Sequence, residues 1–228
     1  MAQRQLRNSE TLAGIPISIL GSPRSTKTTK HSRNQPSPLA HETNSARPAC
    51  VVVPEGIESE CNTLFGFALE CALALPNIDF IWRLHPLISF KTLMKRNRRL
   101  TRRPTNVELS DKTLEEDIAR CRWALYRGTT AVVQAVMGGL SPIYLRIPGE
   151  LTIDPLYEME KGKFVVQTPA EFVAVVGTSG ETSDNTHQQE RAELVDYCSK
   201  FYVPMDFRVL EKIIRDAPPR QPTKPDAI

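Results

Sequence analysis

The run Cys50-Val-Val-Val53, followed directly by Pro54-Glu-Gly56, decides how this chain is expected to fold. An unbroken run of small and β-branched apolar residues predicts a buried strand, and the proline and glycine after it predict a turn. From Glu58 to Leu75 apolar residues recur at helical spacing, and Pro76 ends the helix. A buried strand, a turn and a helix in this order indicate one unit of a parallel α/β sheet.

The same alternation continues through the rest of the chain. Further strands are expected at residues 80–84, 107–109, 123–126, 142–145 and 164–167. Helices are expected at residues 90–100, 114–121, 131–137, 169–176, 188–201 and 207–215. Because strand–helix–strand crossovers are right-handed and join parallel strands, the predicted fold class is α/β: a Rossmann-like three-layer lobe with a mostly parallel sheet and two C-terminal closing helices.

Composition divides the chain into three parts. Residues 1–48 are expected to be a mostly flexible basic segment with a short strand near residues 15–20, because residues 22–48 contain almost no apolar side chain to offset the entropy of ordering. Residues 49–217 form the predicted lobe, and the Pro-rich residues 218–228 a loose tail.

The bulk composition excludes several classes of protein. With 40% hydrophobic and 24% charged residues, the 228-residue chain has the profile of a soluble globular protein. It contains neither an apolar run of about 20 residues nor a secretory signal, so a cytoplasmic location is expected. Its five cysteines form no C-x-x-C pair, which argues against a zinc site and a disulfide framework. Cys61 and Cys71 lie among apolar residues and are predicted to be core side chains.

The positive charge is clustered although the net charge is only +3. Besides the basic N-terminal segment, one cluster without an internal acid comprises Lys91, Lys95, Arg96, Arg98, Arg99, Arg102 and Arg103. Such a cluster attracts nucleic acid, an anionic membrane or phosphorylated substrates, or it is simply a solvated helix face. Nucleic acid is disfavoured, because no helix-turn-helix, RNP or zinc-finger signature is present.

Three turns with unusual residues are expected at the carboxyl edge of the sheet, where open α/β sheets bind ligands. The candidate phosphate-binding residues in these turns are Gly56, Arg83, His85, Arg127, Gly128, Thr129 and Thr130. A glycine followed by two hydroxyls at a helix start offers backbone N–H groups and side-chain donors to a phosphate, although a threonine there can also merely cap the helix. His85 is the candidate catalytic residue, able to donate to or protonate a phosphate, unless it is an ordinary loop histidine.

Other polar residues near these turns are weaker candidates. Glu55, Glu60 and Asp154 are candidate donor or acceptor contacts, but Glu60 also suits a helix N-terminus and Asp154 an Asp-Pro turn. Arg83 and Arg127 are expected either to neutralise a diphosphate or to pair with nearby carboxylates.

The runs Val53-Pro-Glu-Gly56, Phe80-Ile-Trp-Arg-Leu-His-Pro86 and Tyr126-Arg-Gly-Thr-Thr130 resemble those of bacterial surface-carbohydrate glycosyltransferases of the two-lobed GT-B type. They are similar to the C-terminal, nucleotide-sugar-binding half of sialyl-, Kdo- and polyol-phosphate transferases, which share a His-Pro turn and a paired Ser/Thr turn. The resemblance implies that His85, Thr129 and Thr130 hold the phosphate of a nucleotide donor, often a cytidine nucleotide. Gln134 departs from it, because many relatives place a ribose-binding glutamate there.

The predicted function is therefore the donor-binding lobe of a glycosyltransferase in surface polysaccharide synthesis. The expected donor is a CMP-linked or other nucleotide-activated sugar, with no further cofactor and no metal. The acceptor site and catalytic base of such enzymes come largely from the first lobe, so a separate N-terminal lobe is an expected partner and activity of the chain alone stays open. Peripheral contact with the inner face of an anionic membrane is a second expectation. The alternatives are a non-catalytic nucleotide-binding or scaffold module and a basic nucleic-acid-binding protein.

Overall fold

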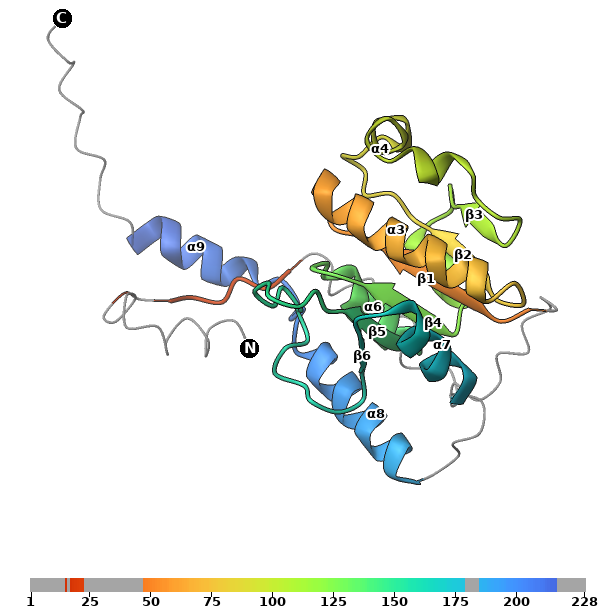
Figure 1. Ribbon diagram of the computed structural model, residues 1–228. Helices are drawn as coiled ribbons and strands as arrows, with labels where there is room; N and C mark the ends of the chain where they lie inside the picture. The colour runs from red at the N-terminus through yellow and green to blue at the C-terminus, as the bar shows by residue number, and fades with distance from the viewer. Residues whose placement is uncertain (1–14, 16, 23–46, 179–184, 217–228) are drawn as a thin grey trace, which may run out of the picture. The chain divides into compact units, whose positions relative to one another are not determined.

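A computed structural model describes residues 15, 17–22, 47–178 and 185–216 (Figure 1). The described residues fall into two units: residues 47–178 and 185–199 form the first, and residues 15, 17–22 and 200–216 belong to the second. The sheet and every candidate site residue belong to the first unit. The expected flexible segment lies almost entirely, and the expected loose tail entirely, outside the described residues.

The first unit is built on a fully parallel six-stranded sheet in the order β3-β2-β1-β4-β5-β6. Its strands are β1 Ala49–Val53, β2 Asp79–Trp82, β3 Val107–Leu109, β4 Trp123–Tyr126, β5 Ser141–Leu145 and β6 Phe164–Val166. The chain first adds strands on one side of β1 and then returns to its other side with β4. The strand order therefore reverses between β1 and β4, and this is the place where open α/β sheets bind ligands.

Helices cover both faces of the sheet and make the three predicted layers (Figure 1). On one face α3 (Glu58–Ala74) packs against α4 (Phe90–Arg96), the 3-10 helix η2 (Arg98–Thr101) and α7 (Pro169–Thr178). On the other face α6 (Ala131–Met137) packs against α8 (Asn185–Ser199), and α5 (Leu114–Ala119) brings Ile118 against the end of α6 at Gly138. The predicted α/β lobe is confirmed, and its sheet is parallel throughout.

The largest core lies between the sheet and α3. All five residues of β1 are buried, as the unbroken apolar run predicts. Phe65 of α3 stacks on Trp82 of β2 with ring centroids 4.7 Å apart. Cys61 and Cys71 are confirmed as core side chains, and all five cysteines are free and buried.

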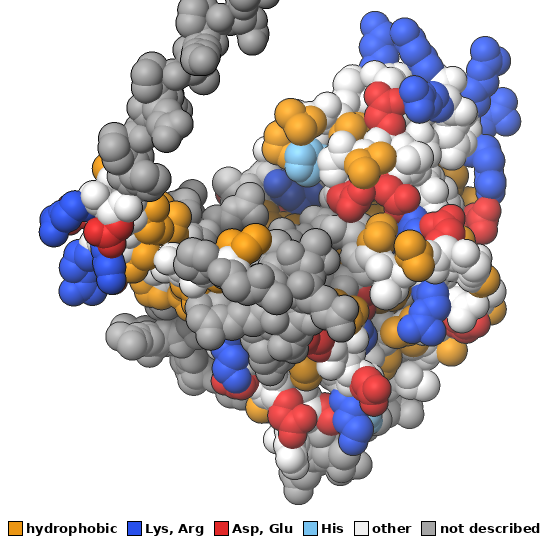
Figure 2. Space-filling view, turned by 90° about the vertical axis from the view of Figure 1, so that its left-hand side faces the viewer, with side chains coloured by type: hydrophobic (Ala, Val, Ile, Leu, Met, Phe, Trp, Pro, Cys, Tyr) orange, Lys and Arg blue, Asp and Glu red, His pale blue; other side chains and the backbone are white. Residues whose placement is uncertain are grey.

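The basic helix expected at residues 90–100 is interrupted. Asn97 leaves the helical conformation with φ −129°, and its side-chain oxygen accepts a hydrogen bond from the Arg99 N–H, which starts η2. An asparagine side chain offers the backbone this alternative to the helical bond. The exposed Lys and Arg side chains around α4 and η2 gather on one edge of the lobe (Figure 2).

The ends of the described chain also differ from expectation. Residues 17–22 form no strand, because their recorded pairing is one bridge between Ser22 and Pro204, flanked by two backbone hydrogen bonds. Helix α9 (Phe207–Asp216) belongs to the second unit, and Ser199 is the last residue of the first.

Candidate functional site

The three predicted turns meet at the point where the strand order reverses. β1 and β4 are adjacent, with Val53 paired to Tyr126, so the turns that follow them lie next to each other. The turn after β2 joins them, because the imidazole of His85 lies against Gly56. The β1 and β4 turns touch through the Glu55 carboxylate, which lies against Gly128. The sequence therefore correctly grouped these residues at one edge.

His85 is held in a defined orientation beside Gly56. A Cβ atom on Gly56 would lie 2.9 Å from Cε1 of the imidazole, so only glycine leaves room for the ring. The Nδ1 atom accepts a hydrogen bond of 3.3 Å from the backbone N–H of Leu87. In the neutral ring this places the proton on Nε2, which makes Nε2 the donor that a ligand oxygen can meet.

The turn after β4 combines a glycine with two hydroxyl side chains. Gly128 has φ +73°, a conformation that glycine adopts without strain. The Thr129 hydroxyl accepts a weak hydrogen bond of 3.3 Å from the Ala131 N–H. Thr130 occupies the cap position of α6, but its exposed side chain makes no capping bond. The capping alternative therefore fits Thr129 in part and does not fit Thr130.

Arg127 is the buried cation of the site. Only 3% of its side chain is exposed, and its two terminal nitrogens pair with Glu60 of α3 and Glu150 of the β5–β6 connection. Its Nε–H has no partner among the described residues. Of the two expectations for this arginine, pairing with carboxylates is what the structure shows. Sequence reasoning missed Glu150, whose only signal was an acid after a glycine beyond the carboxyl end of β5.

The pKa of the Glu55 carboxyl is raised above its ordinary value. Partial burial raises the pKa, the negative charge of Glu60 raises it further, and Arg127 and His85 oppose both effects. Because the raised pKa favours the protonated form, this carboxyl is better suited than an ordinary surface glutamate to donate a hydrogen bond.

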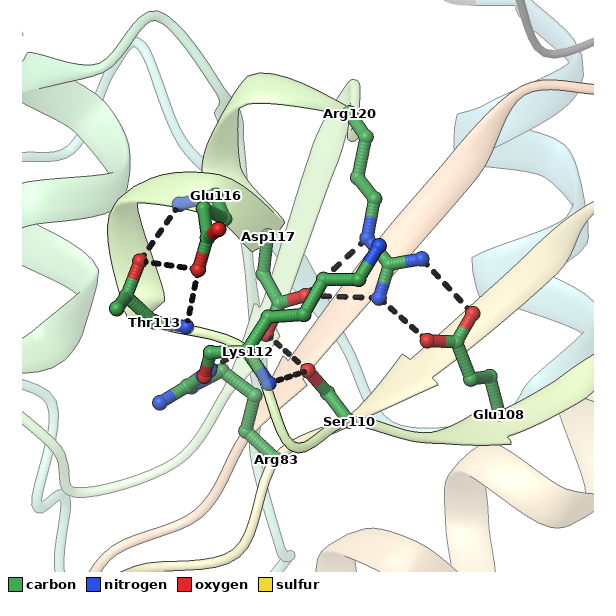
Figure 3. Close-up of polar contacts among 8 residues, drawn as sticks. All are labelled: Arg83, Glu108, Ser110, Lys112, Thr113, Glu116, Asp117 and Arg120. Carbon is green, nitrogen blue, oxygen red and sulfur yellow. Dashed lines mark hydrogen bonds and ion pairs between the residues drawn. The ribbon is translucent and has the colours of Figure 1, made fainter.

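Arg83, a candidate phosphate ligand, belongs to a network of hydrogen bonds with residues of the β3–α5 region (Figure 3). Its guanidinium donates to the Asp117 carboxylate at 2.5 Å and to the Lys112 carbonyl at 2.6 Å. Asp117 is fully buried and also accepts from Ser110 at 2.7 Å and from Arg120 at 2.8 Å. Of the two expectations for Arg83, pairing with a nearby carboxylate is what the structure shows.

Asp154 is held by contacts within the lobe. It is buried, and its Oδ1 accepts from the Tyr126 hydroxyl and the Leu156 N–H, both at 2.8 Å. Its Oδ2 pairs with Lys163. Both oxygens are occupied by the lobe itself, which anchors the β5–β6 connection to β4.

Two other features bear on the sequence predictions. In the part of the chain that the structure describes, no three His, Cys, Asp or Glu side chains gather as a metal site would require. Among the same residues, no helix has both the length and the apolar character needed to cross a bilayer.

Comparison with known proteins adds evidence on the fold. No protein-family model and no curated protein matches the sequence. Among solved structures, the Anabaena protein HepE in complex with UDP-glucose is 13% identical with a TM-score of 0.51, over 85% of this chain and 53% of that one. A spinosyn rhamnosyltransferase is 14% identical with a TM-score of 0.50, over 75% of this chain and 45% of that one.

The strand order and these matches define the structural class. The chain has the fold of one Rossmann-like lobe of the GT-B type. It spans about half the length of the two solved structures described above.

Proposed function

We propose that this chain is the nucleotide-sugar-binding lobe of a glycosyltransferase. The observation that carries the proposal is the convergence of Gly56, His85 and the Gly128–Thr130 turn at the reversal point of the sheet. This is the ligand-binding position of open α/β sheets, and the fold is shared with a protein solved in complex with UDP-glucose.

Each residue has a role that its geometry allows. The Nε2–H of His85 donates to a phosphate oxygen and stabilises the charge that develops on the departing phosphate, so His85 stays the candidate catalytic residue. Gly56 lets the ring approach the backbone of its turn. The hydroxyls of Thr129 and Thr130 donate to the same phosphate, and the positive φ of Gly128 shapes their turn.

The finer assignments extend this proposal. A cytidine nucleotide is the proposed donor base, with uridine as the competing one because of the UDP-glucose complex. The proposed pathway is surface polysaccharide synthesis in the cytoplasm, with the acceptor site on a separate N-terminal lobe. Neither of the two other classes, a non-catalytic module and a nucleic-acid-binding protein, gains a specific contact from the structure.

The basic side chains of α4 and η2 supply a surface for an anionic membrane (Figure 2). Arg96 and Arg99 pair with glutamates of α3, and Arg103 lies 4.6 Å from the centre of the Phe90 ring. Lys91 and Arg98 are exposed, and no ion pair is recorded for them among the described residues. We expect the protein to bind vesicles that contain 30% phosphatidylserine, and the double variant Lys91→Glu, Arg98→Glu to lose this binding. Equal vesicle binding by the double variant would remove this part of the proposal.

The test of the proposed function is nucleotide binding by calorimetry and by the thermal unfolding midpoint. CMP, UDP and AMP are compared, because a ligand that binds only the folded state raises the midpoint. We expect CMP to bind most tightly and AMP least. No binding by any of them at millimolar concentration would reject a nucleotide site, while a midpoint shift with DNA alone would favour the nucleic-acid alternative.

Two substitutions connect this binding to the site. His85→Ala removes a hydrogen bond to a charged group and should weaken nucleotide binding by about tenfold to a hundredfold. Thr130→Val should weaken it by a similar or smaller factor without changing stability, because its hydroxyl makes no capping bond. Thr113→Val is the matched control: Thr113 caps α5, so its loss should cost about 1 kcal/mol of stability and leave binding unchanged. If the His85 and Thr130 variants bind nucleotide as tightly as the original protein, the nucleotide does not bind at these turns.

A further inference from the structure

The charges around Arg127 do not favour an incoming phosphate. One guanidinium faces the carboxylates of Glu60 and Glu150, and Glu55 lies in the adjoining turn. A phosphate that approached this arrangement would meet a cation already neutralised by the protein and a surplus of negative charge. A ligand phosphate can use Arg127 only if one of these carboxylates gives up its place.

The two carboxylates that hold Arg127 are attached to the lobe in different ways. Glu60 lies in the first turn of the long helix α3, and its side chain is 20% exposed. Glu150 is 53% exposed and belongs to the connection between β5 and β6. Because a helix fixes its side chains more firmly than a connecting loop, Glu150 is the partner that can leave.

Residues 148–153 lie between two anchored positions. On one side Ile147 packs against the core, and on the other side Asp154 is buried and bonded to Tyr126 and Lys163. Gly149 has φ +81°, and a Cβ atom added to it would have no heavy atom within 4 Å. Leu151 is 90% exposed.

The other bonds of this segment are long. The N–H of Glu150 donates to the Ile147 carbonyl at 3.3 Å. The hydroxyl of Tyr144 accepts from the Ile153 N–H at 3.3 Å and lies 3.4 Å from the Thr152 hydroxyl. Bonds at this distance are weak, so the ion pair with Arg127 is the strongest contact recorded for residues 148–153.

The same segment also covers the turn proposed to bind phosphate. The side chain of Ile153 lies against Gly128: its Cδ1 atom is 2.9 Å from the position that a Cβ atom on residue 128 would take. Moving residues 148–153 outward would therefore free Arg127 and uncover the Gly128 turn in one step.

We infer that Glu150 is an internal anion that occupies Arg127 in the unliganded lobe and is displaced by a phosphate group of the ligand. The inference rests on the proposed function, and it names Arg127 as the charged ligand of that phosphate and Glu150 as the residue that limits its affinity. The exchange replaces one charge-assisted hydrogen bond by another at the same guanidinium. The Nε–H is buried and no described group accepts it, so it would donate to a second phosphate oxygen once Glu150 has left.

The test uses Glu150→Gln, which keeps the shape of the side chain and removes its charge. Glu160→Gln is the matched control, because Glu160 is an exposed acid farther along the same connection with no recorded contact to Arg127. UDP and inorganic pyrophosphate are titrated into the 228-residue protein and both variants by calorimetry. We expect both ligands to bind Glu150→Gln about tenfold more tightly than the protein with Glu150, and Glu160→Gln to bind them as that protein does.

A second measurement needs no ligand. Amide hydrogen exchange of residues 149–153 should be faster in unliganded Glu150→Gln and unchanged in Glu160→Gln, because the first variant loses the ion pair. Equal exchange in all three proteins, or equal ligand affinity of the two variants, overturns the displaced-anion inference while leaving nucleotide binding intact. If exchange accelerates in Glu150→Gln but neither UDP nor pyrophosphate binds any of the proteins, the phosphate-binding role of Arg127 is overturned. If CMP does not bind either, the proposed function is overturned with it.

Discussion

At the scale of single residues, Gly56 decides whether His85 can take its position. A methyl group on residue 56 would lie 2.9–3.3 Å from three atoms of the imidazole, so Gly56→Ala should push the ring out of place. We expect nucleotide binding about tenfold weaker, measured by calorimetry, with the free energy of unfolding changed by less than about 1 kcal/mol because the imidazole can rotate away.

Gly66→Ala is the control for this prediction. Gly66 lies inside α3, and its added methyl would be 3.8 Å from the Asn97 side chain, an ordinary contact. It should stabilise the helix by about 1 kcal/mol and leave binding unchanged. Equal binding by the Gly56 variant and the Gly66 variant would show that the His85 ring does not contribute to the ligand site.

The sequence predicted where the site lies better than it predicted which residues its arginines contact. The strand ends place Gly56, His85 and Gly128 at one edge, since the period of the apolar residues determines where each strand stops. The partners of Arg83 and Arg127 depend on side chains far away in the sequence, such as Asp117 and Glu150. Nothing local indicates which of 26 acidic residues will reach a given arginine, so both expectations for these arginines had to stay open.

At the scale of elements, the fully buried carboxylate of Asp117 ties α5 to the end of β2. Burial would raise its pKa, but the hydrogen bonds from Arg83, Ser110 and Arg120 together outweigh burial and lower it. Because the pKa of Asp117 is lowered in the folded protein, its ionised carboxylate stabilises the fold at every pH above the pKa of an aspartate in the unfolded chain, near 3.9. This stabilisation is lost as the pH falls through the pKa of Asp117 in the folded protein.

Asp117→Asn should therefore destabilise the protein by about 3 kcal/mol at pH 7, because it leaves two arginines without their shared anion. The difference from the original protein should shrink as the pH falls below about 4 and vanish in strong acid. Urea unfolding at a series of pH values measures this. Asp111→Asn removes the same charge from an exposed loop and should change stability little. A difference independent of pH would mean that shape and not charge makes Asp117 important.

The elements themselves were largely predictable. The strands and most helices follow from apolar runs with clear breaks, as at Pro54 and Pro76. The break at Asn97 was not predictable from periodicity, because the apolar spacing continues through it and a single side-chain hydrogen bond decides the outcome. The described residues of the stretch 15–20 carry no strand pairing, and a strand depends on a neighbour that the local sequence does not reveal.

At the scale of the whole molecule, the proposed function separates binding from catalysis. The described site offers donors for a phosphate in His85 and Arg127. Of its nearby carboxylates, Glu60 and Glu150 are paired with that arginine, while partial burial and the charge of Glu60 raise the pKa of Glu55. The acceptor and its base are proposed to come from a separate lobe.

The 228-residue chain should therefore bind nucleotide sugars without transferring the sugar. Incubation with CMP- and UDP-activated sugars and a mixture of lipid-linked and oligosaccharide acceptors should release nucleotide no faster than a His85→Ala control, measured by chromatography. Adding a first lobe that supplies the acceptor site should restore release, and His85→Ala should then reduce it by about a hundredfold, because the donor to the departing phosphate is lost. Steady turnover by the chain alone would show that a base on this lobe suffices. In that case Glu55→Gln should abolish turnover, since Glu55 is the carboxyl of the site for which no ion pair is recorded among the described residues.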